Sequence, residues 1–134
     1  MKRIYLFFFI TSLLFIFNGC SEKVTEEDLV GGKWVGTAGH ENGKAIGEPN
    51  CFPFQDGIEF KDENTVYVER FERVFEYSIN ESSDITFGDA GPEDASPYTG
   101  YSLYIYHIKM NGEDEIVLEG LHSYIDHACH MERE

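Results

Sequence analysis

The body of the sequence predicts an all-β protein, an antiparallel barrel of about eight short strands. Apolar and polar residues alternate with a period of two in several short runs, most clearly in residues 74–80 (VFEYSIN). Turn-forming residues separate these runs at short intervals, so that sequence neighbours can pair as hairpins. Beyond the N-terminal stretch, no segment requires a long helix. Together these observations favour a closed antiparallel sheet.

The first half of the body contains strands on both sides of a loop. We expect a first strand at residues 33–38 and a loop over residues 39–54, which are rich in glycine and proline. Residues 58–61 and 65–68 form the next expected hairpin, around the polar turn Asp-Glu-Asn. Residues 74–80 follow as a half-buried antiparallel strand. Its apolar face carries Phe75, Tyr77 and Ile79.

The second half contains the longest expected strand, residues 101–110 (YSLYIYHIKM). Residues 82–100 before it are expected to form an acidic, loop-rich segment, with a short strand near Ile85–Phe87. An Asn-Gly turn then leads to a returning strand at residues 115–119, and residues 121–131 are expected to form a final strand.

Both faces of residues 101–110 are apolar, which indicates that the face outside the barrel is covered. We expect Leu103, Ile105 and His107 to face the interior. The opposite face carries Tyr104, Tyr106 and Ile108, and a helix, a loop or another molecule would cover it.

The first residues, MKRIYLFFFITSLLFIFNGC, form a separate segment. Two basic residues precede an apolar run of about 14 residues, the pattern of a secretory signal helix, which is shorter than the roughly 20 residues needed to span a bilayer. The segment resembles a bacterial lipoprotein signal peptide, with Gly19 and Cys20 at the end of a lipobox. The resemblance implies cleavage before Cys20, acylation of that cysteine, and anchoring in the bacterial cell envelope. Ser21 is compatible with the outer membrane. A plain secretory signal and a transmembrane helix are the alternatives.

We therefore divide the chain into a signal peptide (residues 1–19), a tether (20–28) and one barrel domain (29–134). The part after residue 19 has about 115 residues, which suits a single core. The chain holds 25 acidic and 10 Lys and Arg residues, and two of the basic residues lie in the signal segment. So acidic a domain is repelled by nucleic acid, which we do not expect as a partner.

Cys51 and Cys129 are the two cysteines that remain once Cys20 is assigned to the anchor. An even pair in an oxidising compartment predicts a disulfide. Because the bridge would close a long loop, the chain-entropy argument gives it about 4–5 kcal/mol of stabilisation. Two buried free thiols, or Cys129 as a metal ligand, are the competing interpretations.

Residues 29–34 (LVGGKW) resemble the Gly-x-Trp opening of lipocalins, with Gly32 and Trp34 matching. The strand and turn pattern over residues 29–120 is similar to that of bacterial lipocalin-like lipoproteins. The resemblance implies an eight-stranded up-and-down barrel in which Trp34 begins the first strand and plugs the closed end. In that family a late arginine packs on the tryptophan; Arg133 is not assigned this role here, because it stands too near the terminus.

The first functional expectation is a small apolar ligand inside the barrel, or a partner protein on its surface, without catalysis or cofactor. The candidate lining residues are Trp34, Phe60, Phe75, Tyr77, Leu103, Ile105 and His107. The alternative is an envelope interaction or structural module without a cavity, which would use the face of Tyr104, Tyr106 and Ile108.

The C-terminal run from His122 to His130 indicates a further alternative, a metal-binding lipoprotein, because imidazole and thiolate suit zinc or copper. Strand alternation would put His127 and Cys129 on one face and His122 and His130 on the other. A turn near Ala128 would bring His127 and His130 together instead. Motifs of hydrolases, metalloproteases and phosphate-binding loops are absent from the sequence, so we expect no enzyme.

Overall fold

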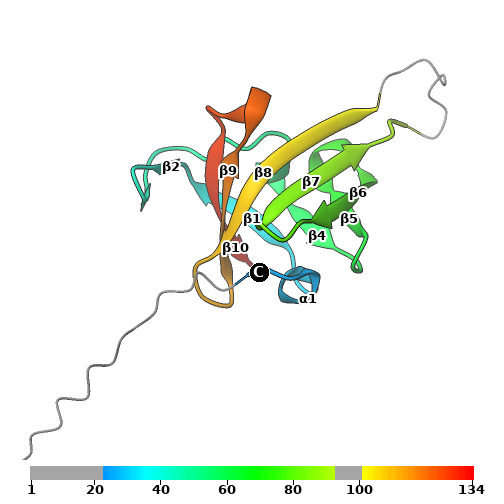
Figure 1. Ribbon diagram of the computed structural model, residues 1–134, viewed down its shortest axis with the longest axis horizontal. Helices are drawn as coiled ribbons and strands as arrows, with labels where there is room; N and C mark the ends of the chain where they lie inside the picture. Colours follow the sequence, from blue (N-terminus) through cyan, green and yellow to red (C-terminus); the bar gives the residue numbers. More distant parts are fainter. Residues whose placement is uncertain (1–22, 93–100) are drawn as a thin grey trace, which may run out of the picture.

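The computed structural model describes residues 23–92 and 101–134. The expected signal helix (residues 1–19) and the expected acylation site, Cys20, lie outside these residues, as do residues 93–100 of the expected acidic, loop-rich segment. Within them, eight strands close into an antiparallel barrel in the order β1-β10-β9-β8-β7-β6-β5-β4 (Figure 1). The predicted all-β barrel is therefore confirmed.

The elements are short and follow one another along the chain. The barrel strands are β1 (Trp34–Ala38), β4 (Ile58–Phe60), β5 (Thr65–Val68), β6 (Arg73–Ile79), β7 (Asp84–Asp89), β8 (Ser102–Met110), β9 (Glu115–Gly120) and β10 (Ala128–Arg133). The remaining elements are α1 (Glu26–Leu29), the outer hairpin β2 (His40–Glu41) and β3 (Lys44–Ala45), and the 3-10 turns η1 (Phe54–Asp56), η2 (Glu69–Phe71) and η3 (His122–Tyr124).

Each barrel strand from β4 to β10 pairs with the next one in the chain, the up-and-down arrangement that short hairpin turns allow. The sheet closes at β1, where Trp34 lies opposite both Arg133 of β10 and Ile58 of β4. Closure leaves no unpaired edge for these strands. Among the described residues, no helix is long and apolar enough to cross a membrane.

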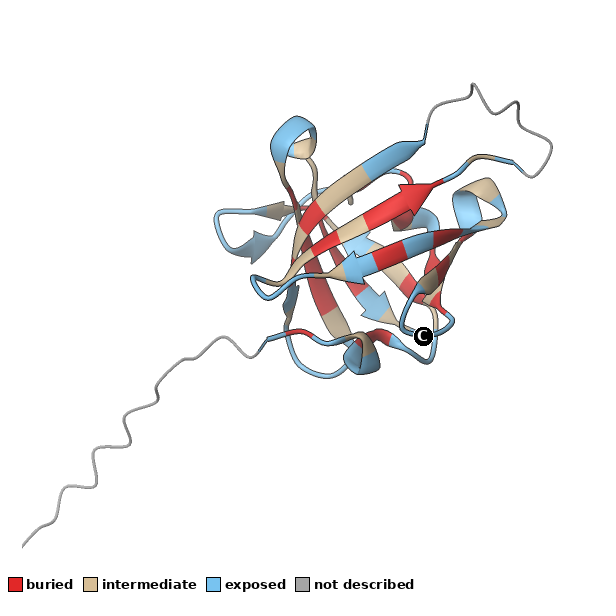
Figure 2. Cartoon of the chain, turned by 45° about the vertical axis from the view of Figure 1, so that its right-hand side comes forward, coloured by how far each residue is buried: buried red, intermediate tan, exposed pale blue. Residues whose placement is uncertain are grey.

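Alternation of side chains fills the interior, as β6 illustrates. Phe75 and Tyr77 are buried, whereas Val74 and Glu76 are exposed, which is the pattern that a period of two requires. The same inward-facing positions on the other strands form one apolar core that is buried along the barrel axis (Figure 2). Val24, which is 1 % exposed, joins this core together with Leu29 of α1.

The expected orientation of β8 is wrong. Tyr106 and Ile108 are buried in the interior, whereas Leu103 is 48 % exposed, and Ile105 and His107 share its outward face. The alternation of β8 could not reveal its direction, because both faces are apolar. The proposed outer interaction face of Tyr104, Tyr106 and Ile108 is thus the inner face of the barrel.

The final strand also differs from the expectation. Residues 122–124 form the turn η3, and β10 begins only at Ala128. His122 has a positive φ of 55°, and the backbone N–H of Gly120 donates to the carbonyl of His127. This closed turn interrupts the strand that was expected to run through residues 121–131.

Candidate ligand site at the barrel mouth

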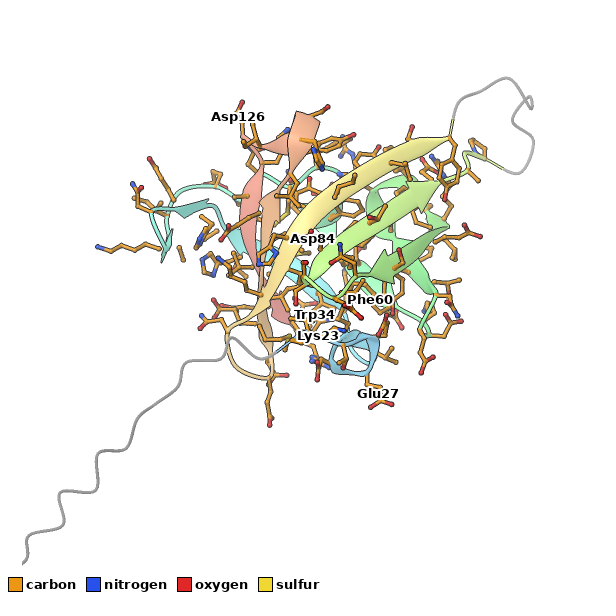
Figure 3. All side chains as sticks on the ribbon, viewed as in Figure 1. Lys23, Glu27, Trp34, Phe60, Asp84 and Asp126 are labelled. Atoms are coloured by element: carbon orange, nitrogen blue, oxygen red, sulfur yellow. A yellow bond between two sulfur atoms is a disulfide. The ribbon has the colours of Figure 1, made fainter. Side chains whose placement is uncertain are left out.

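The barrel has two different ends. The strand turns 61–64, 80–83 and 111–114 lie at the end where α1 packs, which we call the closed end. The turns η1, η2 and η3 lie at the opposite end, which we call the mouth (Figure 1). In Figure 3, Glu27 and Lys23 lie toward the closed end, while Asp126 lies toward the mouth.

Trp34 seals the closed end. Its indole N–H donates to the carbonyl of Leu29 at 2.9 Å, and its side chain is fully buried. The guanidinium of Arg133 lies 4.3 Å from the centre of the indole. Arg133 also donates to the carbonyls of Asp28 and Glu113, both at 2.7 Å. The cation thus holds α1 and the β8–β9 turn against the tryptophan.

The packing of Arg133 on Trp34 was not predicted from the sequence. The signal that could have found it is pairing register: once β1 and β10 are neighbours, Trp34 and Arg133 lie directly opposite each other. The sequence alone does not reveal that pairing, because the two residues stand at opposite ends of the domain.

The interior behind the mouth is filled by aromatic rings. Phe54, from η1, enters the barrel and is fully buried. Its ring stacks on Phe87 with centroids 4.1 Å apart and meets Tyr104 and Tyr106 edge to face. This geometry suits the quadrupoles of the rings. Phe54 therefore occupies the space that an open calyx would leave to a ligand.

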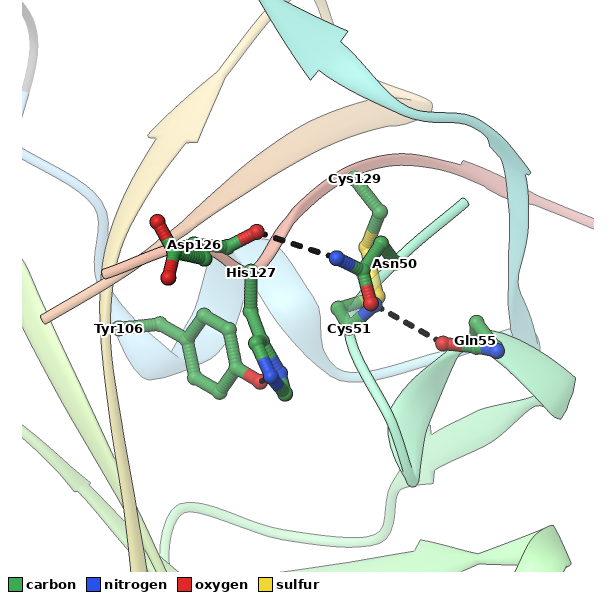
Figure 4. Close-up of a disulfide and its surroundings, with 7 residues drawn as sticks. All are labelled: Asn50, Cys51, Gln55, Tyr106, Asp126, His127 and Cys129. Carbon is green, nitrogen blue, oxygen red and sulfur yellow. Dashed lines mark hydrogen bonds between the residues drawn. A yellow bond between two sulfur atoms is a disulfide. The ribbon is translucent and has the colours of Figure 1, made fainter. Parts of the chain in front are cut away.

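A disulfide fixes the segment that carries Phe54. Cys51 and Cys129 form the expected pair, with Cα atoms 5.7 Å apart, and both are fully buried (Figure 4). The side chain of Gln55 accepts the backbone N–H of Cys51 at 2.8 Å, and Asn50 donates to the carbonyl of Asp126 at 3.0 Å. The aromatic plug is thus attached covalently to β10.

Four partly exposed aromatic residues surround the plug, and we call them the mouth cluster: Phe52, Phe71, Tyr104 and Tyr124. Phe52 is 41 % exposed and meets Phe71 edge to face at 5.9 Å. Tyr104 and Tyr124 lie 5.4 Å apart, and Tyr124 donates to the carbonyl of Leu103. Amphipathic rings at the rim of a barrel suit flat apolar molecules.

One buried ion pair lies beside the mouth cluster. Arg73 makes two hydrogen bonds to the carboxylate of Asp89, which is 6 % exposed. The guanidinium also lies 4.6 Å from the ring centre of Phe71 and 5.7 Å from that of Phe75. The hydrogen bond from Arg73 lowers the pKa of Asp89 below its usual value, against the opposing effect of burial. Asp89 therefore stays ionised in a charge-balanced pair beside the rim.

The structure divides the residues expected to line the ligand site into two groups. Trp34, Phe60, Phe75 and Tyr77 are buried core residues, and the hydroxyl of Tyr77 donates to the carbonyl of Asp62 at 2.7 Å. Burial raises the pKa of Tyr77. Leu103, Ile105 and His107 lie on the outer face instead.

His107 is therefore no interior histidine. Its Nδ1 lies 2.9 Å from a carboxylate oxygen of Asp84 on the neighbouring strand, which lowers the pKa of Asp84. The pair is partly exposed on the outer wall.

The C-terminal histidines are not brought together. His130 Nε2 lies 2.8 Å from Nδ1 of His40, and His130 Nδ1 lies 2.6 Å from Glu115, so these groups fasten the β2–β3 hairpin to the barrel wall. His127 instead lies 3.5 Å from the Tyr106 hydroxyl. Within residues 23–92 and 101–134, no group of three or more His, Cys, Asp or Glu side chains is arranged to hold a metal.

The two pockets that stand out in the described part of the chain lie outside the barrel. The larger is an open groove of about 960 Å³ beside the β8–β9 turn, lined by charged residues that include Lys23, Glu27, Lys109, Asp114 and Arg133. Neither pocket is lined by the mouth cluster or by Phe54. Neither of these pockets therefore reaches the aromatic rim formed by the mouth cluster.

Comparisons of the chain with protein-family models, with curated proteins and with solved structures give no match.

Proposed function

We propose that the protein is a lipid-anchored lipoprotein of the bacterial envelope that acts by binding and not by catalysis. Its lipocalin-like barrel receives a small apolar molecule at the mouth cluster. The observation that carries this proposal is the grouping of Phe52, Phe71, Tyr104 and Tyr124 at one end of a closed barrel. The anchor rests on the lipobox-like sequence that ends at Cys20, with the outer membrane as the expected location.

Two features of the closed end support the lipocalin-like part of the proposal. Trp34 begins the first strand and is buried at the base of the barrel, and Arg133 packs on its indole ring. Both features match what the Gly-x-Trp resemblance implies, although the arginine was not expected from the sequence.

The filled interior restricts where a ligand can bind. Because Phe54 is fully buried among Phe87, Tyr104 and Tyr106, a ligand stacks on the rim and displaces little of the plug. Entry deeper into the barrel requires η1 to move, and the Cys51–Cys129 disulfide restrains that segment.

A fluorescent apolar probe tests the site. We expect N-phenyl-1-naphthylamine to bind the purified full chain saturably, and the double substitution of Phe52→Ala with Tyr124→Ala to weaken binding about tenfold or more, because each exposed ring contributes apolar contact area. Val30→Ala is the matched control, since Val30 is a partly exposed apolar residue at the closed end. Equal losses in both variants, or no saturable binding, contradict a ligand site at the mouth.

A second function is favoured by the same filled interior. An envelope interaction module needs no cavity, and the mouth cluster then contacts an apolar segment of a partner protein. Native mass spectrometry of the protein from its own membrane separates the two: a retained small molecule favours the first function, whereas a retained protein with no small molecule favours the second. The same spectrum reports acylation of Cys20.

A further inference from the structure

We infer that the closed end of the barrel faces the lipid surface and that the mouth cluster is directed away from it, toward the aqueous compartment. This inference rests on the proposed acylation of Cys20 and adds the orientation of the anchored domain. It assigns the closed end as a membrane-facing surface, and it gives the mouth a ligand or partner that arrives from water rather than from the bilayer.

The first step is the short distance between the anchor and the core. Val24 is 1 % exposed and Leu29 is fully buried, so the chain is fixed to the barrel from Val24 onward. The Asp28 carboxylate accepts hydrogen bonds from the backbone N–H and the hydroxyl of Thr25, at 2.8 and 2.9 Å, which fixes the first turn of α1. Cys20 stands only a few residues before Val24. Even fully extended, that stretch spans at most about 14 Å.

The second step is the height of the barrel. β8 (Ser102–Met110) runs from the mouth to the closed end, and its length is about 30 Å at the usual rise per residue. A strand tilt of about 35–45° still leaves a height above roughly 20 Å. Because the tether joins the barrel at α1, it is too short to let the mouth press face-on into the bilayer while Cys20 remains inserted.

The third step concerns charge. The exposed side chains at the closed end are mainly acidic and include Glu27, Asp28, Glu63, Glu81, Glu113 and Asp114. Anionic headgroups repel such a surface over a Debye length of about 10 Å at 0.1 M salt, a distance similar to the reach of the tether. Charge therefore does not attract the closed end to an anionic membrane, and only the acyl anchor holds it there. Added salt screens the repulsion and lets the closed end approach anionic lipid more closely.

Spin labels at the two ends test the orientation. We replace Glu27→Cys at the closed end or Asp126→Cys at the mouth, two exposed acidic residues (Figure 3), and reconstitute each nitroxide-labelled, acylated full chain into phosphatidylcholine vesicles that contain a nickel-chelating lipid. We expect the membrane-bound nickel to increase the spin relaxation rate of the nitroxide at residue 27 at least fivefold more than that of the nitroxide at residue 126. Equal or reversed enhancements overturn the inference.

A lengthened tether is the control for the cause. Insertion of about 12 Gly and Ser residues between Glu22 and Lys23 raises the maximum distance from Cys20 to Val24 to more than 50 Å. The ratio of the relaxation enhancement at residue 27 to that at residue 126 should then fall toward one. A contrast that persists contradicts the argument from tether length. With phosphatidylglycerol added to the vesicles, the enhancement at residue 27 should rise with salt, and a fall contradicts the charge argument.

Mass spectrometry of the protein purified from its own membrane separates this inference from the proposed function. An unacylated Cys20 removes the anchor and the orientation together. An acylated Cys20 with labels that do not differ leaves the anchored lipoprotein in place and removes only the orientation.

Discussion

The closed end and the mouth of this barrel are both sealed, but by different means. At the closed end, Arg133 stacks on Trp34 and donates to backbone carbonyls of α1 and of the β8–β9 turn. At the mouth, Phe54 fills the space among other rings, and a disulfide holds its segment. The closed end depends on one cation with fixed backbone partners, whereas the mouth depends on apolar packing around a covalent link.

Under the proposed function, this difference gives the two ends of the barrel separate tasks. Backbone carbonyls accept the guanidinium of Arg133 in a defined geometry, so the closed end is specified almost residue by residue. Aromatic contacts at the mouth are individually weak and tolerate rearrangement. A site that has to admit another molecule is therefore better placed at the mouth, where substitutions should affect binding more than they affect the barrel closure.

Removal of the disulfide should have the largest effect on this comparison. The double substitution of Cys51→Ser with Cys129→Ser, whose sequence separation is 78, should lower the free energy of unfolding by about 4–5 kcal/mol. Urea unfolding measures the loss. Hydrogen exchange should accelerate in residues 50–57 before it accelerates in residues 24–34, because only the mouth loses its covalent link. Uniform acceleration of both segments would falsify the separation of the two ends.

The same conservative substitution at each end should have unequal effects. Arg133→Lys should lower the free energy of unfolding by about 2 kcal/mol, because lysine loses the planar fork and the stacking on Trp34. Arg70→Lys at the mouth should cost less than about 0.5 kcal/mol, since Arg70 is exposed and its contacts with Asp56 and Phe52 are at the surface. Thermal unfolding of both variants decides the point, and a larger loss at Arg70 would reverse our ranking.

The ion pair beside the mouth should make part of the stability sensitive to acid. The pKa of Asp89 is lowered in the folded protein by Arg73, so its contribution is present above about pH 4 and is lost as the pH falls through the folded-state pKa. Asp89→Asn should cost about 1–2 kcal/mol at pH 7 and less at pH 3. Urea unfolding at both pH values measures the difference. A cost that does not change with pH would show that the pair contributes through packing alone.

The inward face of a strand could be predicted correctly from the sequence only where its apolar and polar residues alternate clearly. β6 was predicted correctly because its aromatic residues, Phe75 and Tyr77, lie on one face and alternate with polar residues, so their burial follows from alternation. β8 is apolar on both faces, and its inner and outer faces were exchanged. Residues 121–127 contain no proline or glycine that would end a strand after Leu121, so the turn at His122 was missed.

The candidate site was predicted only in part, for a related reason. Trp34, Phe60, Phe75 and Tyr77 lie on strands whose pattern is clear, and all four are interior residues. Phe54 and Phe52 lie in a loop, where no periodicity indicates which side chain enters the barrel. Their positions depend on η1 and on the link to Cys129 on β10.

The sequence by itself determined the strand-and-turn order, the inward face of the amphipathic strands and the pairing of two cysteines, because period, turn chemistry and cysteine count are local or compositional properties. Only the tertiary structure decided that Arg133 packs on Trp34, that Phe54 fills the mouth and which face of β8 is buried. These contacts join residues far apart in the chain, and closure of the barrel, not any local preference, brings them together.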